Sequence, residues 1–372
     1  MHIVVDARIR RSSTGRYADR LLKHLQEIDQ NNKYTVLLEG DDDWQPTSKN
    51  FKVLRVSYKQ FSFSLFEQIG FARTLYKLKP DVVHFTMTQQ PIFYFGPIVT
   101  TTHDLTMLNF VRSKGQFYLT FWLKQVSYRF MLWWSHRKSK RIIVPTKYVL
   151  KDVLSFHKFT AGKVFVTYEA SEPEISGSIK PVDYVKRPFI LYVGSAFPHK
   201  NLKKLIDAFY DISYRYKDLQ LVLAGKEEYY YKELIQYAQN TQTAHRIIFT
   251  GYVDDSKLKW LYKNAEAYVF PSLSEGFGLP GLEAMVHGCP VISSNATCLP
   301  EVYGDSALYF DPQNAADIAA TISKILEDNS IRKDLIRKGY VQAKKYSWQE
   351  MAKQTLYIYQ KVEQIGQKNN HS

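Results

Sequence analysis

Cysteine is scarce in this chain: two of the 372 residues are cysteines, Cys289 and Cys298. Two cysteines cannot build a disulfide scaffold, and their spacing fits no zinc-binding motif, so we expect a reducing compartment. No run of about 18 uncharged apolar residues occurs, which argues against a transmembrane helix. Seven of the first 20 residues are charged, which argues against a signal peptide. With 45% hydrophobic and 23% charged residues, the composition excludes a disordered or collagen-like chain.

Positive charge is abundant but unevenly distributed. The length favours two domains. Residues 1–180 hold 27 basic and 15 acidic side chains, whereas residues 181–372 hold 23 and 21. Most of the excess lies in residues 51–150, with 15 basic against 3 acidic side chains. A basic face on one half predicts an anionic partner, and nucleic acid, anionic lipid and a phosphorylated acceptor are all open at this point.

Short apolar runs alternate with helical patterns in two series. The first series is MHIVVDARI, KYTVLLE, KVLRV, DVVHF, PIVTTTHD and RIIVPT, and the second is RPFILYVGS, LQLVLAG, RIIFTG, AEAYVF, CPVISS and ALYF. Strands that alternate with helices indicate parallel sheets covered on both faces. The polar segment 170–187 between the series suits a linker. The expected class is therefore α/β, with two doubly wound domains.

The expected domain boundaries follow from this linker. We predict a first domain over residues 1–180, a second over 181–350 and a final helix with a tail over 351–372. Ser347 and Glu350 form a capping box ahead of that helix, and the tail after about residue 365 should fray.

The segment 271–290, PSLSEGFGLPGLEAMVHGCP, carries the most chemistry. Its glycines Gly276, Gly278 and Gly281 permit backbone conformations and close approaches that a Cβ would forbid. The loop leads from a strand into a helix that starts at Pro280, and that edge of a sheet is where α/β folds bind ligands. Amide hydrogens and the helix dipole there favour a phosphate.

Three charged side chains near this loop could meet such a ligand. Glu275 can point at a ligand in the cleft, and Glu283, eight positions later, can accept hydrogen bonds from a ribose. Lys200 lies at the mouth of the helix after the strand ILYV and could hold a diphosphate. The alternative is that Glu275 is a solvated loop residue, Glu283 a helix-capping acid and Lys200 a solvated lysine.

The stretch SEGFGLPGLEAM resembles the E-x7-E element of retaining glycosyltransferases with the GT-B fold, family 4. Companion segments occur in the family's order: TGRY, DVVHF, TTHDL, VPTKYVLKDV, YVGSAFPHKN, LVLAGK, FTGYV and LPEVYGDSALYFDP. The resemblance covers roughly residues 1–360. It implies two Rossmann-like domains facing a cleft, with the nucleotide sugar in the second, the acceptor in the first and the last helix crossing back onto the first.

The resemblance also implies roles for single residues. Glu275 would contact the hydroxyls of the donor sugar, Glu283 the nucleotide ribose, and Lys200 the leaving diphosphate. Backbone groups of the glycine loop would meet the sugar and diphosphate. The segment 251–253 would border the nucleobase. The remaining donor-binding residues are then Gly194, Ser195, Gly251, Tyr252, Val253, Gly276, Phe277, Gly278 and Leu279. Ser195 stands where many relatives have an arginine, so diphosphate neutralisation would rest on Lys200 and the helix dipole.

Two residues of the first half complete the implied site. Gly15 would let the backbone approach the diphosphate, and His103 in TTHDL would lie near the reacting sugar. Catalytic roles are implied for His103, Lys200 and Glu275. A core histidine with satisfied hydrogen bonds is the alternative for His103. His84 and His287 are interpreted as structural.

The implied reaction is retaining and metal-independent, moving a mannose- or glucose-type hexose from a GDP- or UDP-sugar to a glycan or lipid-linked acceptor. No other cofactor is expected. The aspartates at 41–43 look solvated rather than metal-binding. The oxocarbenium-like transition state and the leaving diphosphate call for positioning and charge stabilisation. A non-catalytic scaffold of the same fold, binding a membrane or a partner enzyme, is the alternative.

Aromatic and basic residues interleave in residues 112–141 and again in 52–79. Either they form a peripheral membrane face, or the aromatics are the first domain's core with lysines at its rim. The membrane hypothesis places an anionic membrane surface against residues 51–141 and the protein on the cytoplasmic side of the cell membrane. No nucleic-acid recognition motif accompanies the charge, so nucleic acid is not expected as a partner.

Overall fold

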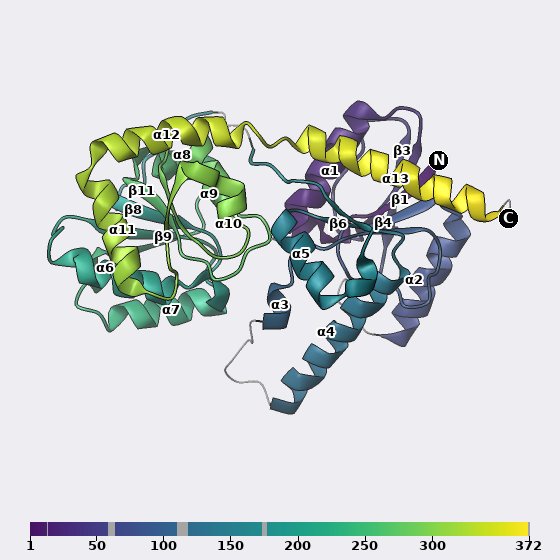
Figure 1. Cartoon of the computed structure of the whole chain (residues 1–372), viewed down its shortest axis with the longest axis horizontal. Coiled ribbons are helices and arrows are strands. Elements are labelled where there is room, and N and C mark those ends of the chain that lie inside the picture. Colours follow the sequence, from purple (N-terminus) through teal and green to yellow (C-terminus); the bar gives the residue numbers. More distant parts are fainter. Residues whose placement is uncertain (13, 59–63, 110–117, 173–176, 371–372) are drawn as a thin grey trace. The chain divides into compact units, whose positions relative to one another are not determined.

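The computed structural model describes residues 1–12, 14–58, 64–109, 118–172 and 177–370, and its chain divides into two compact units (Figure 1). The first unit comprises Met1–Glu169 with Ser347–Ser372, and the second comprises Ala170–Tyr346. The divisions thus fall at 169/170 and 346/347 rather than at the predicted 180/181 and 350/351.

Hydrogen bonds explain why the end of the predicted linker belongs to the second unit. The Lys180 amide donates to the carbonyl oxygen of Ser256 at 3.3 Å, and the Lys186 amide donates to Gln220 Oε1 at 2.7 Å. Val182 and Val185 are buried beside them. Residues from about 180 onward are therefore packed chain of the second unit and not a free connection.

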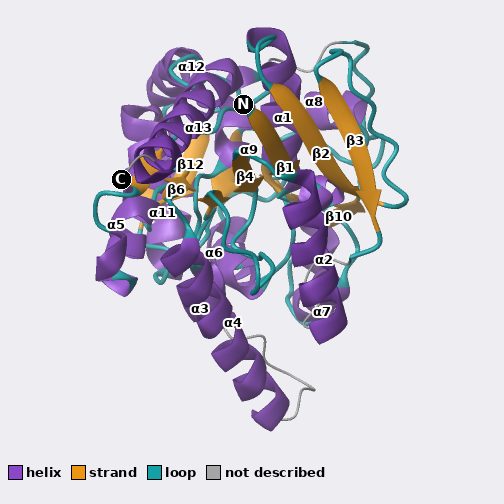
Figure 2. Ribbon diagram, turned by 90° about the vertical axis from the view of Figure 1, so that its right-hand side faces the viewer, coloured by secondary structure: helices purple, strands orange, loops and turns teal. Residues whose placement is uncertain are grey.

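The first unit is built on a seven-stranded parallel sheet in the order β3-β2-β1-β4-β5-β6-β7. Its strands are β1 His2–Asp6, β2 Lys33–Glu39, β3 Phe51–Val56, β4 Val82–Phe85, β5 Ile98–Thr101, β6 Arg141–Val144 and β7 Val164–Val166. Strands β1, β2 and β3 run side by side (Figure 2). Each apolar run of the first series forms a strand, and β7 is one that the sequence analysis missed.

Helices cover this sheet, and the last of them comes from the far end of the chain. They are α1 Gly15–Ile28, α2 Leu65–Leu78, α3 Thr106–Asn109, α4 Tyr118–Lys138, α5 Lys147–Phe156 and α13 Trp348–Asn370, with short 3-10 turns η1 Arg8–Arg11 and η2 Lys158–Thr160. Helix α13 packs beside α1 (Figure 1). The predicted return of the final helix is confirmed, although α13 is helical to Asn370, past the point where fraying was expected.

The predicted cap of α13 is present. The Glu350 amide donates to Ser347 Oγ at 3.3 Å, just before the helix begins at Trp348. The apolar face that follows includes Met351, Ile358 and Tyr359, all buried. This face attaches the helix to the first unit.

The second unit repeats the architecture with a six-stranded parallel sheet in the order β10-β9-β8-β11-β12-β13. Its strands are β8 Phe189–Val193, β9 Gln220–Ala224, β10 Ile247–Gly251, β11 Ala267–Phe270, β12 Val291–Ser294 and β13 Ala307–Phe310. Its helices are η3 Pro198–Lys200, α6 Leu202–Ser213, α7 Tyr229–Gln239, η4 Ala244–Arg246, α8 Asp255–Asn264, α9 Leu279–Val286, α10 Leu299–Tyr303, η5 Gly304–Ser306, α11 Ala315–Glu327 and α12 Asn329–Ala343.

Strand order decides where ligands can bind in each unit. In each sheet the order in which strands are added reverses beside the first strand, between β1 and β4 in the first unit and between β8 and β11 in the second. The loops leaving the carboxyl ends of those strands diverge to opposite faces, which opens a crevice at this switch point. Within the described ranges, every helix is too short or too polar to span a bilayer.

Candidate functional site

The glycine loop lies between β11 and α9 and is held by a buried tyrosine. Gly278 opens α9 with a left-handed backbone, φ 98°, and the Tyr303 hydroxyl donates to its carbonyl oxygen at 2.5 Å. A Cβ at Gly278 or at Gly281 would collide with the Tyr303 side chain. The predicted need for glycine is confirmed at these two positions. The close contact with Tyr303 fixes the path of the loop into the helix.

Lys200 and Glu275 form an ion pair at the switch point of the second sheet. Lys200 ends the turn after β8 and Glu275 lies in the loop after β11, and Nζ and Oε1 are 2.6 Å apart. The two side chains are 16% and 12% exposed. Because the pair is shielded from water, each charge depends on the other or on a ligand. This contact was not predicted.

The loop after β12 holds Glu275 in place. The Glu275 amide donates to Thr297 Oγ1 at 3.2 Å, and Cys298 Sγ donates to the Glu275 carbonyl oxygen at 3.2 Å. On the other side, Asn201 Nδ2 donates to the carbonyl oxygens of Pro271 at 3.1 Å and Pro312 at 2.7 Å. Sequence reasoning missed these supports, because their partners are distant in the chain.

Gly194 ends β8 in a region of positive φ, 148°, that favours glycine. Its amide donates to the Ala224 carbonyl oxygen at 2.9 Å, while the Tyr192 hydroxyl donates to the Ser195 carbonyl oxygen at 2.7 Å. Gly194 and Ser195 are thus anchored next to the turn that carries Lys200, as the prediction requires.

The segment Gly251–Val253 leaves β10, two strands away from β8. Gly251 has φ 64°, its amide donates to the Tyr231 hydroxyl oxygen at 2.9 Å, and its carbonyl oxygen accepts from Gly225 at 3.1 Å. Tyr252 is 73% exposed and lines a hollow with Lys226 and Glu227. An exposed ring at this edge of the sheet can stack on a flat ligand.

Glu283 lies within α9, as predicted, and faces α8. Oε2 accepts from the Tyr262 hydroxyl at 3.4 Å, and the Glu283 carbonyl oxygen accepts from His287 Nδ1 at 2.8 Å. The His287 ring stacks on Tyr262 at 5.2 Å, which confirms its packing role. The second unit therefore gathers the predicted donor residues along the carboxyl ends of β10, β8 and β11.

His103 belongs to the first unit, in the loop after β5. Its Nε2 donates to the Thr86 carbonyl oxygen at 3.0 Å, and Nδ1 lies 3.2 Å from Glu169 Oε1. Burial lowers the pKa of His103, but the Glu169 carboxylate and the Thr86 carbonyl outweigh it, so the pKa is raised overall. Both ring nitrogens have partners in the unit, as the core-histidine alternative expects. Glu169 was missed in the sequence.

Gly15 begins α1 in the first unit. A Cβ there would collide with the carbonyl group of Arg10, so the close approach of η1 alone requires a glycine. Its proposed approach to a diphosphate stays a prediction. His84 is structural, as predicted, because Nδ1 lies 2.6 Å from the Tyr359 hydroxyl and Nε2 lies 2.8 Å from Thr101 Oγ1.

The prediction of solvated aspartates at 41–43 is wrong for Asp42, which is 3% exposed. Arg10 donates to it through Nε at 3.0 Å and Nη2 at 2.6 Å, and these bonds hold the pKa of the carboxyl below its usual range against the opposing effect of burial. Asp42 is an anchor of the β2–β3 connection. The sequence did not reveal it because Arg10 is 32 positions away.

The basic, aromatic part of the first unit is divided between core and surface. Met131, Leu132 and Phe71 are buried, whereas Trp122 and Phe66 are 52% and 82% exposed. Phe61, Phe63 and residues 112–117 of the predicted membrane face lie outside the described residues. These residues are thus partly core and partly surface, and contact of the exposed ones with a membrane stays a prediction.

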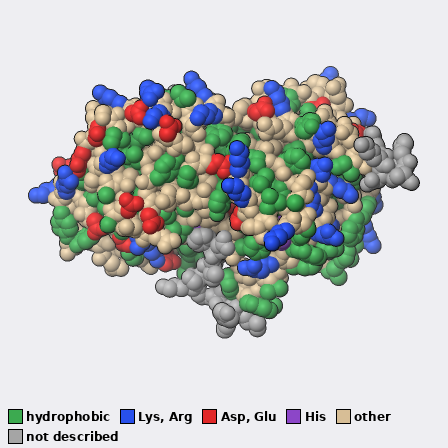
Figure 3. Space-filling model, viewed as in Figure 1, with side chains coloured by type: hydrophobic (Ala, Val, Ile, Leu, Met, Phe, Trp, Pro, Cys, Tyr) green, Lys and Arg blue, Asp and Glu red, His purple; other side chains and the backbone are tan. Residues whose placement is uncertain are grey.

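Four of the aromatic side chains form a cluster, Phe130, Trp133 and Trp134 on α4 and Phe95 beside the helix, with ring centroids 5.7–6.2 Å apart in contacting pairs. On the face in Figure 3, hydrophobic and basic side chains lie next to each other over this unit. Phe95, Phe130 and Trp133 are exposed, and Lys138 Nζ lies 5.7 Å from the centre of the Phe95 ring, so the aromatic cluster is a surface feature with a cation beside it.

Known proteins share this architecture. Sucrose-phosphate synthase from Thermosynechococcus elongatus superposes with a TM-score of 0.75 at 19% identity, covering 97% of this chain and 99% of that one. Anabaena HepE, solved in complex with UDP-glucose, gives a TM-score of 0.68 at 16% identity over 99% and 100% of the two chains. These likenesses show the fold, a GT-B arrangement of two Rossmann-like units.

Sequence comparison reaches further. O-antigen chain mannosyltransferase B of Escherichia coli is 32% identical over 233 residues, and the match spans 59% of this chain and 60% of that protein. The profile described as Glycosyltransferase Family 4 matches residues 14–172, and that described as Glycosyl transferases group 1 matches residues 178–342. Taken together, the two profiles cover most of both units and leave out α13, and the chain belongs to the group 1 glycosyltransferases of the GT-B fold.

Proposed function

We propose that the protein is a retaining hexosyltransferase that moves a sugar from a nucleotide-diphosphate donor to a glycan or lipid-linked acceptor. The observation that carries this proposal is the shielded pair of Lys200 and Glu275 at the switch point, beside the first turn of α9. A cation, a carboxylate and a helix N-terminus at one edge of the sheet suit a ligand with an anionic end and a hydroxyl-rich end.

In this proposal the diphosphate takes Glu275's place beside Lys200. The freed carboxylate then accepts hydrogen bonds from hydroxyls of the donor sugar. Glu283 accepts from the ribose, and the exposed Tyr252 ring stacks on the base. The amides at the start of α9 and the Lys200 ammonium offset charge that grows on the diphosphate as it leaves, which is the largest catalytic effect available here. This charge compensation needs no metal ion.

The chemical step is a substitution at the anomeric carbon. An acceptor hydroxyl oxygen attacks the carbon from the face that the diphosphate leaves. The bond between carbon and phosphate oxygen breaks, its electron pair stays on the diphosphate, and the acceptor proton passes to a phosphate oxygen. Configuration is retained, and no protein nucleophile takes part.

The donor is proposed to be GDP-mannose, because the E. coli relative above is named a mannosyltransferase. A UDP-sugar is the second candidate, since Anabaena HepE was solved with UDP-glucose. A panel of sugar nucleotides separates the two by the rate of nucleotide release. Proton NMR of the product's anomeric signal tests retention, and assays with EDTA test metal independence. No nucleotide release from any donor, in the presence of mixed glycan acceptors, would favour the non-catalytic scaffold.

We also propose that the aromatic cluster docks the protein on an anionic membrane, on the cytoplasmic side. Three of its rings lie on α4, and the fourth, Phe95, lies in a loop, residues 91–95, that hydrogen bonds tie to that helix. Lys138 Nζ donates to the carbonyl oxygens of Pro91 at 2.6 Å and Tyr94 at 3.0 Å, and Trp134 Nε1 donates to that of Ile92 at 3.0 Å. Phe95 is 62% exposed despite these ties. Exposed Arg129, Arg137 and Lys140 supply charge for anionic headgroups.

A further inference from the structure

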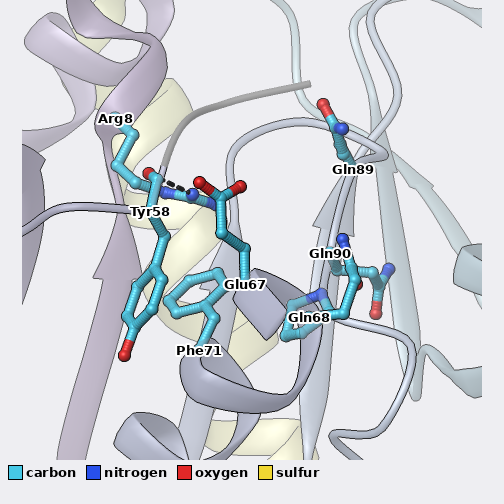
Figure 4. A pocket seen from close by; sticks show the side chains of 8 residues that line it. Arg8, Tyr58, Glu67, Gln68, Phe71, Gln89 and Gln90 are labelled. Atoms are coloured by element: carbon cyan, nitrogen blue, oxygen red, sulfur yellow. Dashed lines mark hydrogen bonds between the residues drawn. The ribbon is translucent and has the colours of Figure 1, made fainter. Parts of the chain in front are cut away.

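The first unit has a pocket at its own switch point, lined by residues that follow three different strands. Arg8 follows β1, Tyr58 follows β3, and Gln89 and Gln90 follow β4 (Figure 4). The first turn of α2 closes it with Glu67. Its volume is about 20 Å³, so it admits a hydroxyl-bearing edge of a ligand rather than a whole ring system. By strand order this is the position at which an α/β sheet binds ligands.

Arg8, the one cation among the described residues that line the pocket, is already neutralised. Arg8 pairs with Asp6 in a two-pronged contact, Nε to Oδ1 at 2.8 Å and Nη2 to Oδ2 at 2.7 Å, and both side chains are buried. Its Nη1 donates to the Tyr58 carbonyl oxygen at 3.0 Å, the bond drawn in Figure 4. The guanidinium also lies 4.2 Å from the centre of the Phe71 ring. An anionic ligand would thus gain little from Arg8.

Two acceptor atoms of the pocket have no hydrogen-bond donor among the residues that the structure describes. Gln90 Oε1 and Glu67 Oε2 are shielded from solvent and accept no hydrogen bond from any residue that the structure describes. Gln90 is 2% exposed, and its Nε2 donates to Thr100 Oγ1 at 3.2 Å, which fixes the direction of the amide. Buried acceptors without donors are unfavourable unless a ligand supplies the hydrogens.

We propose that this pocket binds the neutral, hydroxyl-rich end of the acceptor, a terminal glycosyl residue, with two of its hydroxyls donating to Glu67 and Gln90. The proposal rests on the transferase function above and specifies its acceptor. Hydroxyl groups match the pocket because they donate, whereas a phosphate dianion only accepts and would face the Glu67 carboxylate. The pocket therefore selects a sugar terminus over a phosphorylated one.

The test measures binding of two probe sets by ligand-observed NMR: neutral methyl hexosides and methyl N-acetylhexosaminides, and the matching sugar 6-phosphates. We expect at least one neutral glycoside to bind and the phosphates to bind more weakly. Glu67→Gln and Gln90→Met should each weaken glycoside binding roughly tenfold or more. The control Glu27→Gln, an exposed glutamate of α1, should leave it unchanged.

Thermal shifts with GDP and UDP check that the variants are folded, and they report the second unit independently. Stronger binding of the phosphates, equal glycoside binding in both pocket variants, or no glycoside binding at all would overturn the acceptor proposal. Failure of the transferase function itself would be seen in a different measurement, the nucleotide-release assay, as no release from any donor. A water molecule as the pocket's sole occupant would give the no-binding result.

Discussion

Lys200 and Glu275 are 75 positions apart, and the fold alone makes them partners. Sequence reasoning identified both residues and assigned them separate ligands. It could not predict their pairing, because that requires knowing that β11 lies next to β8. The same limit applies to Glu169 beside His103 and to Arg10 on Asp42, where the motif contains only one member of the pair.

We predict that Glu275→Gln lowers turnover by about two to three orders of magnitude, because it removes the carboxylate that would bind the donor sugar. Lys200 then lacks an anionic partner in a shielded place, so the free energy of unfolding should fall by about 1–3 kcal/mol. Initial rates and urea unfolding measure the two effects. The matched control is Glu233→Gln, which breaks the more exposed pair with Lys203 in the same unit and should cost less than about 1 kcal/mol. Full turnover in Glu275→Gln would remove the assigned role.

The raised pKa of His103 predicts a pH dependence of stability. A group whose pKa is raised on folding stabilises the protein below its unfolded pKa, ordinarily about 6.5, and the gain is lost as pH rises through the folded pKa. Glu169→Gln removes the carboxylate that raises the pKa, so burial should then lower it. NMR titration of the His103 ring should show a downward pKa shift in this variant. A titration curve that does not move would show that Glu169 is not the cause.

At the scale of elements, hydrophobic patterning predicted strands better than it predicted surfaces. Twelve apolar runs in the sequence became twelve strands, because strands buried on both faces are continuously apolar. β7 escaped notice because it has three residues and none is fully buried. The aromatic residues of α4 could not be divided into core and surface from the sequence, since their spacing gives no clear apolar stripe and burial depends on what packs against each side.

We predict that the aromatic cluster mediates membrane binding. Phe95→Ser combined with Trp133→Ser should weaken flotation with phosphatidylcholine vesicles that contain phosphatidylglycerol, by roughly tenfold, because two exposed rings no longer enter the interface. Added salt should weaken binding further by screening the cations. Tyr229→Ser, an equally exposed aromatic of α7, is the control. Flotation that is indifferent to the double variant, to salt and to anionic lipid would contradict the proposal.

At the scale of the whole molecule, the two units differ in how many segments of the chain they are built from. The second unit is one uninterrupted stretch, Ala170–Tyr346, whereas the first needs α13. Helix α13 buries Trp348, Met351, Ile358 and Tyr359. Each such side chain contributes about 1.5–3 kcal/mol, so their sum is comparable to the stability of a whole domain.

Deleting residues 347–372 should therefore unfold the first unit and leave the second unit folded, with its amides protected from hydrogen exchange. Hydrogen exchange followed by mass spectrometry would show fast exchange in β1–β7 and slow exchange in β8–β13. The milder variant Tyr359→Phe, which loses the contact with His84, should cost only about 1 kcal/mol. Equal protection of both units after the deletion would contradict this account of α13.

The return of α13 also has a consequence for biosynthesis. On the ribosome, residues 1–169 emerge first, yet they lack their covering helix until some 180 further residues have been translated. All strands and helices of the second unit have been translated before α13. The first unit therefore cannot complete its native packing until α13 has been made, and until then the side of α1 that packs against α13 is uncovered.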